Sequence, residues 1–124
     1  MKKIIYTPNA PEPIGPYSQA VLVGDTLYCS GQIPVNPENE EVPQGIEAQT
    51  LQVMKNLQAI LHQADMDFSN VVKPTILLTD LSTIGILNEI YGRFFQSQPP
   101  ARETYQVAKL PKGVEVEISA VAVK

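Results

Sequence analysis

The chain has 124 residues, of which 44% are hydrophobic and 18% charged, a balance typical of a single globular domain that excludes a disordered or fibrous protein. Thirteen acidic residues against nine basic ones give a formal net charge of -4, which disfavours nucleic-acid binding. The single cysteine, Cys29, excludes an intrachain disulfide and is typical of a reducing compartment, so we expect a cytoplasmic location.

The sequence contains no long apolar segment. After Met1, Lys2 and Lys3, the only apolar run before the first proline is Ile4 to Tyr6, which is too short for a signal peptide. No window approaches the roughly 18 apolar residues that span a bilayer. We therefore expect no interaction with a membrane and no export by these routes.

The N-terminal half of the chain predicts strands followed by a helix. Gly24-Asp25 separates two segments rich in strand-forming residues, which predicts a β-hairpin. The prolines of residues 8–16 exclude a helix there, and residues 31–45 predict a loop. Apolar residues then recur at three- and four-residue spacing, which predicts a helix that packs on a sheet. The expected elements are strands 3–6, 18–23 and 26–30 and a helix over 44–65.

The C-terminal half predicts a strand, a second helix and two more strands. Pro74 lies within the first of these strands and cannot donate to a sheet ladder, so it belongs at an edge, an end or a bulge. A polar residue, Asp80 or Ser82, can cap the second helix, whose apolar residues extend to Phe95. The expected strands are 71–79, 105–109 and 114–123.

The last strand presents two different faces. Its even-numbered residues, from Val114 to Ala122, are all apolar and predict the face that packs under the helices. Its odd-numbered residues, from Glu115 to Val123, are polar at first and apolar at the end. Helices on one side of a sheet do not account for this second face, so we expect a subunit interface to bury it.

These elements predict one domain over residues 1–124 with the order β-β-β-α-β-α-β-β. The fold class is α+β, with both helices packed on one face of the sheet. No internal repeat, low-complexity tract or inter-domain linker is present in the sequence.

The common catalytic motifs are absent. The glycines are scattered and open no phosphate-binding loop, so no nucleotide cofactor is expected. His62 is the only histidine, and a lone helical histidine is most often a surface residue, so it is assigned no catalytic role. Glu40, Glu41 and Glu47 are interpreted as a solvated acidic stretch, and no metal site is predicted.

Arg102 and Glu117 are candidates for chemistry. Arg102 follows the stiff segment Pro99-Pro100-Ala101, where its guanidinium could bind a carboxylate through two parallel hydrogen bonds. Glu117 lies in the last strand, and burial there would raise its pKa toward the range that water activation requires. On the residues alone, the commoner alternatives remain favoured: a surface arginine or ion-pair partner, and an outward-facing glutamate.

Tyr17 and Cys29 each have a structural and a functional interpretation. Tyr17 follows Gly15-Pro16, and its ring could wall a small pocket with the hydroxyl as a donor, although core packing is the commoner role. Cys29 is expected to be a small buried apolar residue rather than a reactive thiol.

Seven short segments extend along nearly the whole chain: Asn9-Ala10-Pro11, Ile14-Gly15-Pro16-Tyr17-Ser18-Gln19, Ser30-Gly31-Gln32-Ile33-Pro34, Thr79-Asp80-Leu81, Asn88-Glu89-Ile90-Tyr91, Pro100-Ala101-Arg102 and Val107-Ala108-Lys109-Leu110-Pro111-Lys112. In order and spacing they resemble the RidA/YjgF family of enamine and imine deaminases, also called the endoribonuclease L-PSP family. Any one segment would be weak evidence, but the set is specific.

The resemblance implies a fold like that of chorismate mutase, assembled as a homotrimer with clefts between neighbouring subunits. Such an assembly would bury the second face of the last strand. In a cleft, Arg102 would bind the carboxylate of an amino-acid-derived enamine or imine, and Glu117 would position or activate the attacking water. The other pocket residues that it implies are Tyr17, Ser30, Gly31, Asn88, Glu103 and Thr104.

The implied activity is the hydrolysis of 2-aminoacrylate, 2-aminocrotonate and their imines, which are made by PLP-dependent dehydratases, to 2-oxo acids and ammonia. No cofactor is expected, because an imine carbon is already electrophilic and needs only positioning and proton transfer. The expected partners are a small carboxylate-bearing enamine, imine or 2-oxo acid and further copies of the chain.

The chain departs from the family pattern directly after Arg102. Many bacterial members have serine and then cysteine there, whereas this chain has Glu103 and Thr104, so a thiol contribution is lost and the contact at Thr104 would be mainly through the backbone. Glu103 adds a negative charge beside a site for anions, so it could weaken substrate binding or pair with Arg102. The substrate range is left open.

Other functions compete with the deaminase. A regulatory trimer that binds a 2-oxo acid without turnover would need Arg102 but not Glu117. RNA cleavage, also ascribed to relatives, is disfavoured by the acidic balance and the lack of a histidine base. A chaperone-like role is neither supported nor excluded, and the physiological substrate is not identified.

Overall fold

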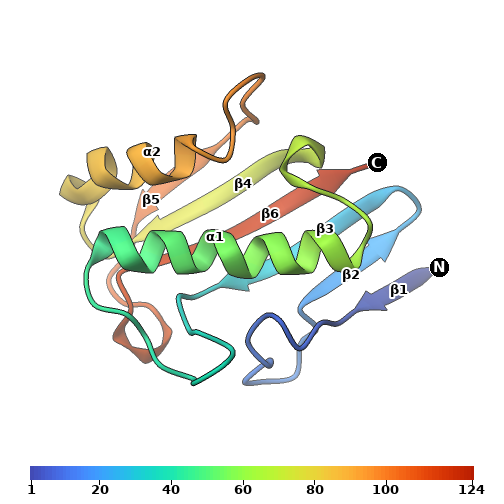
Figure 1. The fold of residues 1–124 in the computed structure, drawn as a ribbon, viewed down its shortest axis with the longest axis horizontal. Helices are drawn as coiled ribbons and strands as arrows, with labels where there is room; N and C mark the ends of the chain where they lie inside the picture. Colours follow the sequence, from blue (N-terminus) through green and yellow to red (C-terminus); the bar gives the residue numbers. More distant parts are fainter.

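The computed structural model of residues 1–124 contains a six-stranded sheet with two helices across one face (Figure 1). Short 3-10 turns precede β4, α2 and β6. The observed order confirms the predicted β-β-β-α-β-α-β-β arrangement and the α+β class. In chain order the elements are β1 (Lys2–Ile5), β2 (Ala20–Val23), β3 (Thr26–Gln32), α1 (Ile46–Gln63), β4 (Val71–Leu78), α2 (Ile84–Gly92), β5 (Glu103–Gln106) and β6 (Val116–Val123).

The strands lie in the order β1-β2-β3-β6-β4-β5, and only the β4–β5 pair is parallel. The β2–β3 hairpin turns at Gly24, whose φ of 59° is a left-handed conformation that glycine adopts without strain. Helix α2 lies in the crossover connection that the parallel pair requires. The last strand in sequence, β6, lies inside the sheet between β3 and β4, so neither of its edges is free.

The last two strands begin at other residues than predicted. The strand expected at 105–109 begins at Glu103, because the Ala101 amide already donates to the Val72 carbonyl at 3.1 Å and lays the chain along β4. Strand β6 begins at Val116, since Val114 still closes the preceding turn.

The second helix is shorter than predicted. Asp80 caps the 3-10 turn before α2, where its side chain accepts a hydrogen bond from the Ser82 amide at 3.0 Å. Beyond the end of α2, Phe94 and Phe95 pack on the ring of Phe68, with centroids 5.1 and 5.4 Å away. The apolar pattern therefore continues past the helix because these rings belong to the core.

Pro74 is accommodated as expected for a proline within a sheet. The pairing of β4 with β6 has a register irregularity between Val71 and Lys73, just before the proline. The pairing of β4 with β5 begins only at Thr75, opposite Glu103. Pro74 lies between the register irregularity and the first residue of the β4–β5 pairing. Its missing N–H therefore removes no hydrogen bond from that parallel pairing.

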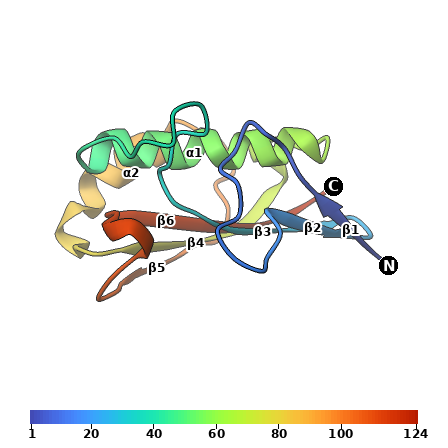
Figure 2. The same cartoon turned by 90° about the horizontal axis from the view of Figure 1, so that it is seen from below.

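The helices cover one face of the sheet, as the alternation of β6 predicts (Figure 2). The even-numbered residues of β6 are all buried, whereas Glu117, Ser119, Val121 and Val123 are half-buried or exposed. The apolar stripe predicted for α1, made of Ile46, Leu51, Met54, Leu57, Ile60, Leu61 and Ala64, packs above this face. All of these residues except Leu51 are buried.

The opposite side of the sheet, here called the open face, has no helix over it (Figure 2). Register places large apolar side chains there, because residues paired on neighbouring strands point to the same face. An uncovered apolar surface of this kind marks an interaction site. Its most exposed members are Ile4, Val23, Tyr28, Tyr105 and Val123, each at least 37% exposed.

Gln19 anchors the proline-rich connection between β1 and β2. The residue is 2% exposed, and its Oε1 accepts a hydrogen bond from the Thr7 amide at 2.7 Å. Its Nε2 donates to the carbonyls of Thr7, Ala10 and Pro11 at 3.0, 3.3 and 3.0 Å. Because prolines lack amide donors, this side chain supplies pairing that the loop backbone cannot supply itself.

We expect Gln19→Ala to lower the free energy of unfolding by about 2–4 kcal/mol, because buried backbone groups of the loop lose their partners. Urea denaturation at one fixed protein concentration measures the change. The matched control is Gln96→Ala, since Gln96 is exposed and makes only a 3.4 Å bond to the Arg93 carbonyl. Equal losses in the two variants would contradict the anchoring role.

Candidate active site

Arg102 lies directly before β5 and against helix α2. Its Nη1 donates to Oδ1 of Asn88 at 2.8 Å, and its Cζ lies 5.1 Å from the centroid of the Tyr91 ring. No carboxylate of the chain forms an ion pair with it. We call Arg102, Asn88 and Tyr91 the Arg102 cluster. It holds a half-buried guanidinium in place and leaves most of its N–H groups available to an anion.

The local sequence explains why the Arg102 cluster forms. Asn88 and Tyr91 are three residues apart in α2 and therefore share one side of the helix. Pro99 and Pro100 stiffen the connection, and the Ala101 amide is bonded to β4, so Arg102 enters β5 at a fixed point. The guanidinium is positioned from the helix and from the sheet at once.

Glu117 is the second residue of β6 and lies on the open face, and its carboxylate forms no hydrogen bond or ion pair within the chain. Burial raises the pKa of this carboxyl above its ordinary value. Gly31 lies directly against it, at the register shift of β3 between Cys29 and Gln32. A Cβ added at Gly31 would lie 2.8 Å from the carboxyl carbon of Glu117, so only glycine allows this approach.

Tyr17, Ser30, Gly31 and Glu117 line one hollow of about 350 Å³, here called the Glu117 hollow. The Ser30 hydroxyl donates to the Ser18 carbonyl at 2.6 Å, and the Tyr17 hydroxyl accepts a hydrogen bond from the Ile14 amide at 3.2 Å. The O–H of Tyr17 is therefore free to donate to a ligand. The remaining lining residues are Ile14, Ile33 and Pro111.

The Arg102 cluster and the Glu117 hollow lie on opposite faces of the sheet. Thr104 pairs with Ile76, whose buried side chain faces the helices, and Arg102 contacts α2 on the same side. Glu117 pairs with Leu77 on the open face. A single chain therefore assembles each group of predicted site residues but does not bring the two groups together.

Glu103 does not pair with Arg102, so the internal pairing considered from the sequence does not form. Its carboxylate lies on the open face, where it forms an ion pair with Lys73 and accepts a hydrogen bond from the Tyr105 hydroxyl. These contacts, first the Lys73 bond, lower the pKa of the Glu103 carboxyl. On the other face, Thr104 has a buried Oγ1 without a hydrogen-bond partner.

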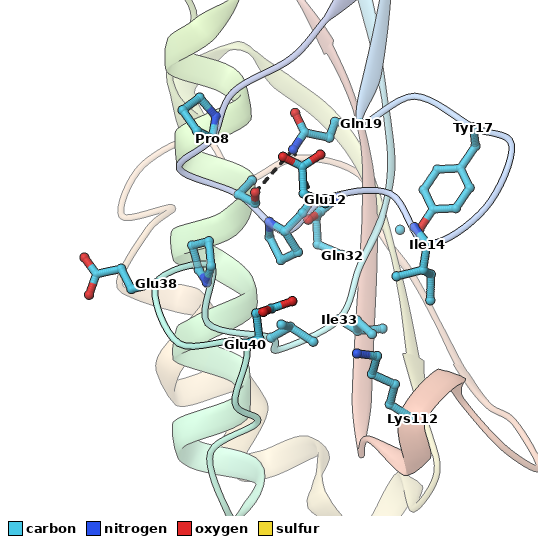
Figure 3. Close-up of a pocket in the computed structure, with 15 residues that line it drawn as sticks. Pro8, Glu12, Ile14, Tyr17, Gln19, Gln32, Ile33, Glu38, Glu40 and Lys112 are labelled. Atoms are coloured by element: carbon cyan, nitrogen blue, oxygen red, sulfur yellow. Dashed lines mark hydrogen bonds between the residues drawn. The ribbon is translucent and has the colours of Figure 1, made fainter.

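A second cavity of about 360 Å³ adjoins the Glu117 hollow, between the proline-rich loop and the loop after β3 (Figure 3). Glu12, Glu38 and Glu40 line it, with Lys112 as the only basic lining residue. Its lining is net negative, so the Arg102 cluster is the more favourable place for a carboxylate. The cavity and the hollow share Ile14, Tyr17, Gly31 and Ile33.

Sequence reasoning missed Tyr91 and Lys73 as parts of the site. The apolar pattern predicts Tyr91 only as a buried helix residue. Its spacing of three residues from Asn88 puts both side chains on one side of the helix, and this spacing could have indicated that both contact Arg102. Lys73 has no such signal, because only the register of β4 with β5 brings it near Glu103.

The remaining candidates lie apart from these groups. His62 is exposed on α1, and Cys29 is buried, where burial raises the pKa of its thiol to about 12. The chain contains no group of three or more histidine, cysteine, aspartate or glutamate side chains placed to hold a metal ion. None of its helices combines the length and the apolar character needed to cross a membrane.

Comparison with known proteins adds independent evidence. The sequence model of the family described as Endoribonuclease L-PSP matches residues 7–124. The 2-iminobutanoate/2-iminopropanoate deaminase of Rattus norvegicus is 51% identical over 100% of this chain and 91% of its own length. The crystal structure of RidA from an Antarctic Psychrobacter has a TM-score of 0.96 at 43% identity, over 98% of this chain and 99% of that one. E. coli TdcF with bound serine has a TM-score of 0.95 at 42% identity, over 98% of both chains.

In the wild-type protein, carbon-13 NMR titration should give Glu117 a pKa above the ordinary glutamate value, because burial disfavours its charged form. Gly31→Ala should bring that pKa back toward the ordinary value, since the new methyl group pushes the carboxylate toward solvent. Gly85→Ala is the control, because nothing lies within 4 Å of a Cβ there. A Glu117 titration that is the same in Gly31→Ala and wild type would contradict the close approach.

Proposed function

This chain belongs to the endoribonuclease L-PSP family, the RidA/YjgF family of enamine and imine deaminases, and from that membership we propose that it hydrolyses the reactive imines of small amino acids. The substrates are 2-aminoacrylate, 2-aminocrotonate and their imines, and the products are pyruvate or 2-oxobutanoate with ammonia. The observation that carries the proposal is the Arg102 guanidinium, which is held by Asn88 and Tyr91 and has no carboxylate partner within the chain.

The proposed chemistry needs positioning more than activation. Two parallel N–H bonds from Arg102 to the substrate carboxylate fix the orientation of the imine. Water adds to the electrophilic imine carbon while Glu117 accepts one of its protons, and Glu117 returns that proton to the substrate nitrogen. The tetrahedral adduct then loses its hydroxyl proton to the nitrogen as the C–N bond breaks, which releases ammonia and leaves the 2-oxo acid. The raised pKa of Glu117 makes it a stronger base than an exposed glutamate.

The active assembly that we propose is a homotrimer with a site at each subunit interface. Arg102 and Glu117 lie on opposite faces of one sheet, so a site with both must take them from two chains. The apolar open face, with Tyr28 and Tyr105 half exposed, offers the surface that neighbouring copies would bury. Each cleft then places the Arg102 cluster of one subunit opposite the Glu117 hollow of the next.

Thr104 and Tyr17 complete the proposed pocket. The buried Thr104 Oγ1 has no partner within the chain, and a buried hydroxyl in this state is normally satisfied by a ligand or a bound water. The Tyr17 hydroxyl keeps its own O–H free while it accepts a hydrogen bond from Ile14. The Tyr17 hydroxyl therefore offers a donor to the reacting water or the substrate nitrogen in the cleft, whereas the Thr104 hydroxyl, which is closed to solvent within the chain, would be satisfied by an internal water.

A second candidate function is a sensor that binds a small amino or 2-oxo acid without turnover. It is favoured by the solved relative TdcF, which holds serine. Binding a carboxylate requires the Arg102 cluster but leaves Glu117 without a task. The two functions therefore differ in the expected effect of losing Glu117. A deaminase would lose catalysis, whereas a sensor would still bind its ligand.

In a coupled assay, a PLP-dependent threonine or serine dehydratase generates the enamine, and the appearance of 2-oxo acid is followed with time. Wild type should accelerate it, Arg102→Ala should lose about 100-fold or more in kcat/KM through lost positioning, and Glu117→Gln about 10²- to 10⁴-fold as a lost general base. Activity should fall as the pH is lowered through the raised pKa of Glu117, because the carboxylate is the base.

The matched controls for this assay are Arg93→Ala and Glu115→Gln, which change the same residue types outside both groups and should retain activity. If wild type adds nothing over spontaneous hydrolysis, the deaminase proposal fails and the sensor becomes the leading function. Retained activity in Glu117→Gln would remove Glu117 from the mechanism.

Mixing inactive subunits tests whether the site is shared between chains. When Arg102→Ala and Glu117→Gln chains are denatured together in equal amounts and refolded, every mixed trimer should contain one site with both wild-type residues. Random mixing should then restore about a quarter of the wild-type activity. Each variant refolded alone is the control, and recovery no greater than in these controls would contradict a site shared between subunits.

A further inference from the structure

Three side chains contact one another on the open face, and the central one, Glu103, is the residue directly after Arg102. Lys73 forms an ion pair with Glu103, and the Tyr105 hydroxyl donates to the same carboxylate. Register places Glu103 opposite Thr75 and so brings Lys73, two residues earlier on β4, to its side of the sheet. We call Lys73, Glu103 and Tyr105 the open-face trio.

The charge of Glu103 matters because of its distance from Arg102. Consecutive Cα atoms are about 3.8 Å apart, so the two side chains leave the strand close together although they point to opposite faces. At an intermediate effective dielectric constant, a carboxylate this close to the guanidinium weakens its affinity for an anion about fivefold. Glu103 would therefore oppose substrate binding if it were not neutralised.

We propose that the open-face trio sets the substrate charge that Arg102 accepts: Lys73 neutralises Glu103 and Tyr105 holds it on the open face, so that the site retains one net positive charge for a monoanionic substrate. Lys73 and Tyr105 are positioning residues that act through Glu103. The inference rests on the proposed function and narrows it to imines with a single carboxylate. An imine or 2-oxo acid with a second carboxylate finds no second cation in the Arg102 cluster to bind it.

The protonation of the trio agrees with this arrangement. The bond to Glu103 raises the pKa of Lys73, and the bond to Lys73 lowers the pKa of Glu103, so both groups are charged at neutral pH. In the proposed trimer a neighbouring subunit covers the open face. An unpaired Glu103 carboxylate would then be buried at a large cost in free energy, so its ion pair with Lys73 becomes more important. Within one chain, the Lys73 and Glu103 side chains are 49% and 36% exposed, so replacing them disturbs little of the core.

The test compares wild type with Lys73→Met, Glu103→Gln and the double variant. For 2-aminocrotonate at low salt, Lys73→Met should raise KM about three- to tenfold with little change in kcat, and the double variant should restore KM. Added salt should reduce the difference. Glu103→Gln should bind 2-oxoglutarate more tightly relative to 2-oxobutanoate than wild type does, because it adds one net positive charge. Lys55→Met, an exposed lysine on α1, is the control.

Two readouts separate failure of this inference from other failures. Carbon-13 titration of Glu103 should show its pKa rising in Lys73→Met whether or not the protein is a deaminase. Light scattering shows whether each variant keeps the oligomeric state of wild type. If wild type is active but Lys73→Met keeps its KM, or the double variant is as impaired as Lys73→Met, the inference is wrong. An inactive wild type that also binds neither 2-oxo acid would instead overturn the proposed function.

Discussion

A β-strand sends successive side chains to opposite faces of its sheet, and the positions of the functional groups in this chain follow from that alternation. Arg102 and Thr104 lie on the helix side of β5, Glu103 between them lies on the open face, and Glu117 lies on the open face of β6. No change of side-chain rotamer moves a group through a sheet. A site that uses both Arg102 and Glu117 therefore requires a second copy of the chain, and the open face supplies an apolar surface for it.

The precision of each half of the site comes from the core. Tyr91 packs against Phe95 with ring centroids 4.8 Å apart, so the ring that contacts the Arg102 guanidinium is itself part of the aromatic core. On the other side of the sheet, Gly31 lacks the Cβ that would displace the Glu117 carboxylate, so the carboxylate keeps its partly buried position. The guanidinium is thus held by neighbours that packing has fixed, which is the condition for positional catalysis.

The sequence predicts the order of elements because hydrophobic period and turn chemistry agree in most segments: Gly24 marks the hairpin, and the alternation of β6 gives both of its faces. It predicts Arg102 and Glu117 as candidates because a stiff segment and a mid-strand charge are local features. Contacts such as Lys73 with Glu103 are not predicted, because they depend on the register between strands that are distant in sequence. The approach of Gly31 to Glu117 depends on a register shift that leaves no local signal.

The separation of Arg102 and Glu117 also has a chemical consequence. A guanidinium and a carboxylate adjacent on one face of a sheet would pair with each other, as Lys73 and Glu103 do on the open face. Pairing would occupy the anion-binding N–H groups and lower the basicity of the carboxylate. The sheet prevents this collapse within the chain, and in the proposed trimer a cleft as wide as the substrate would keep the two groups apart. In the proposed mechanism, the substrate carboxylate would neutralise the arginine and leave Glu117 free to take the proton from water.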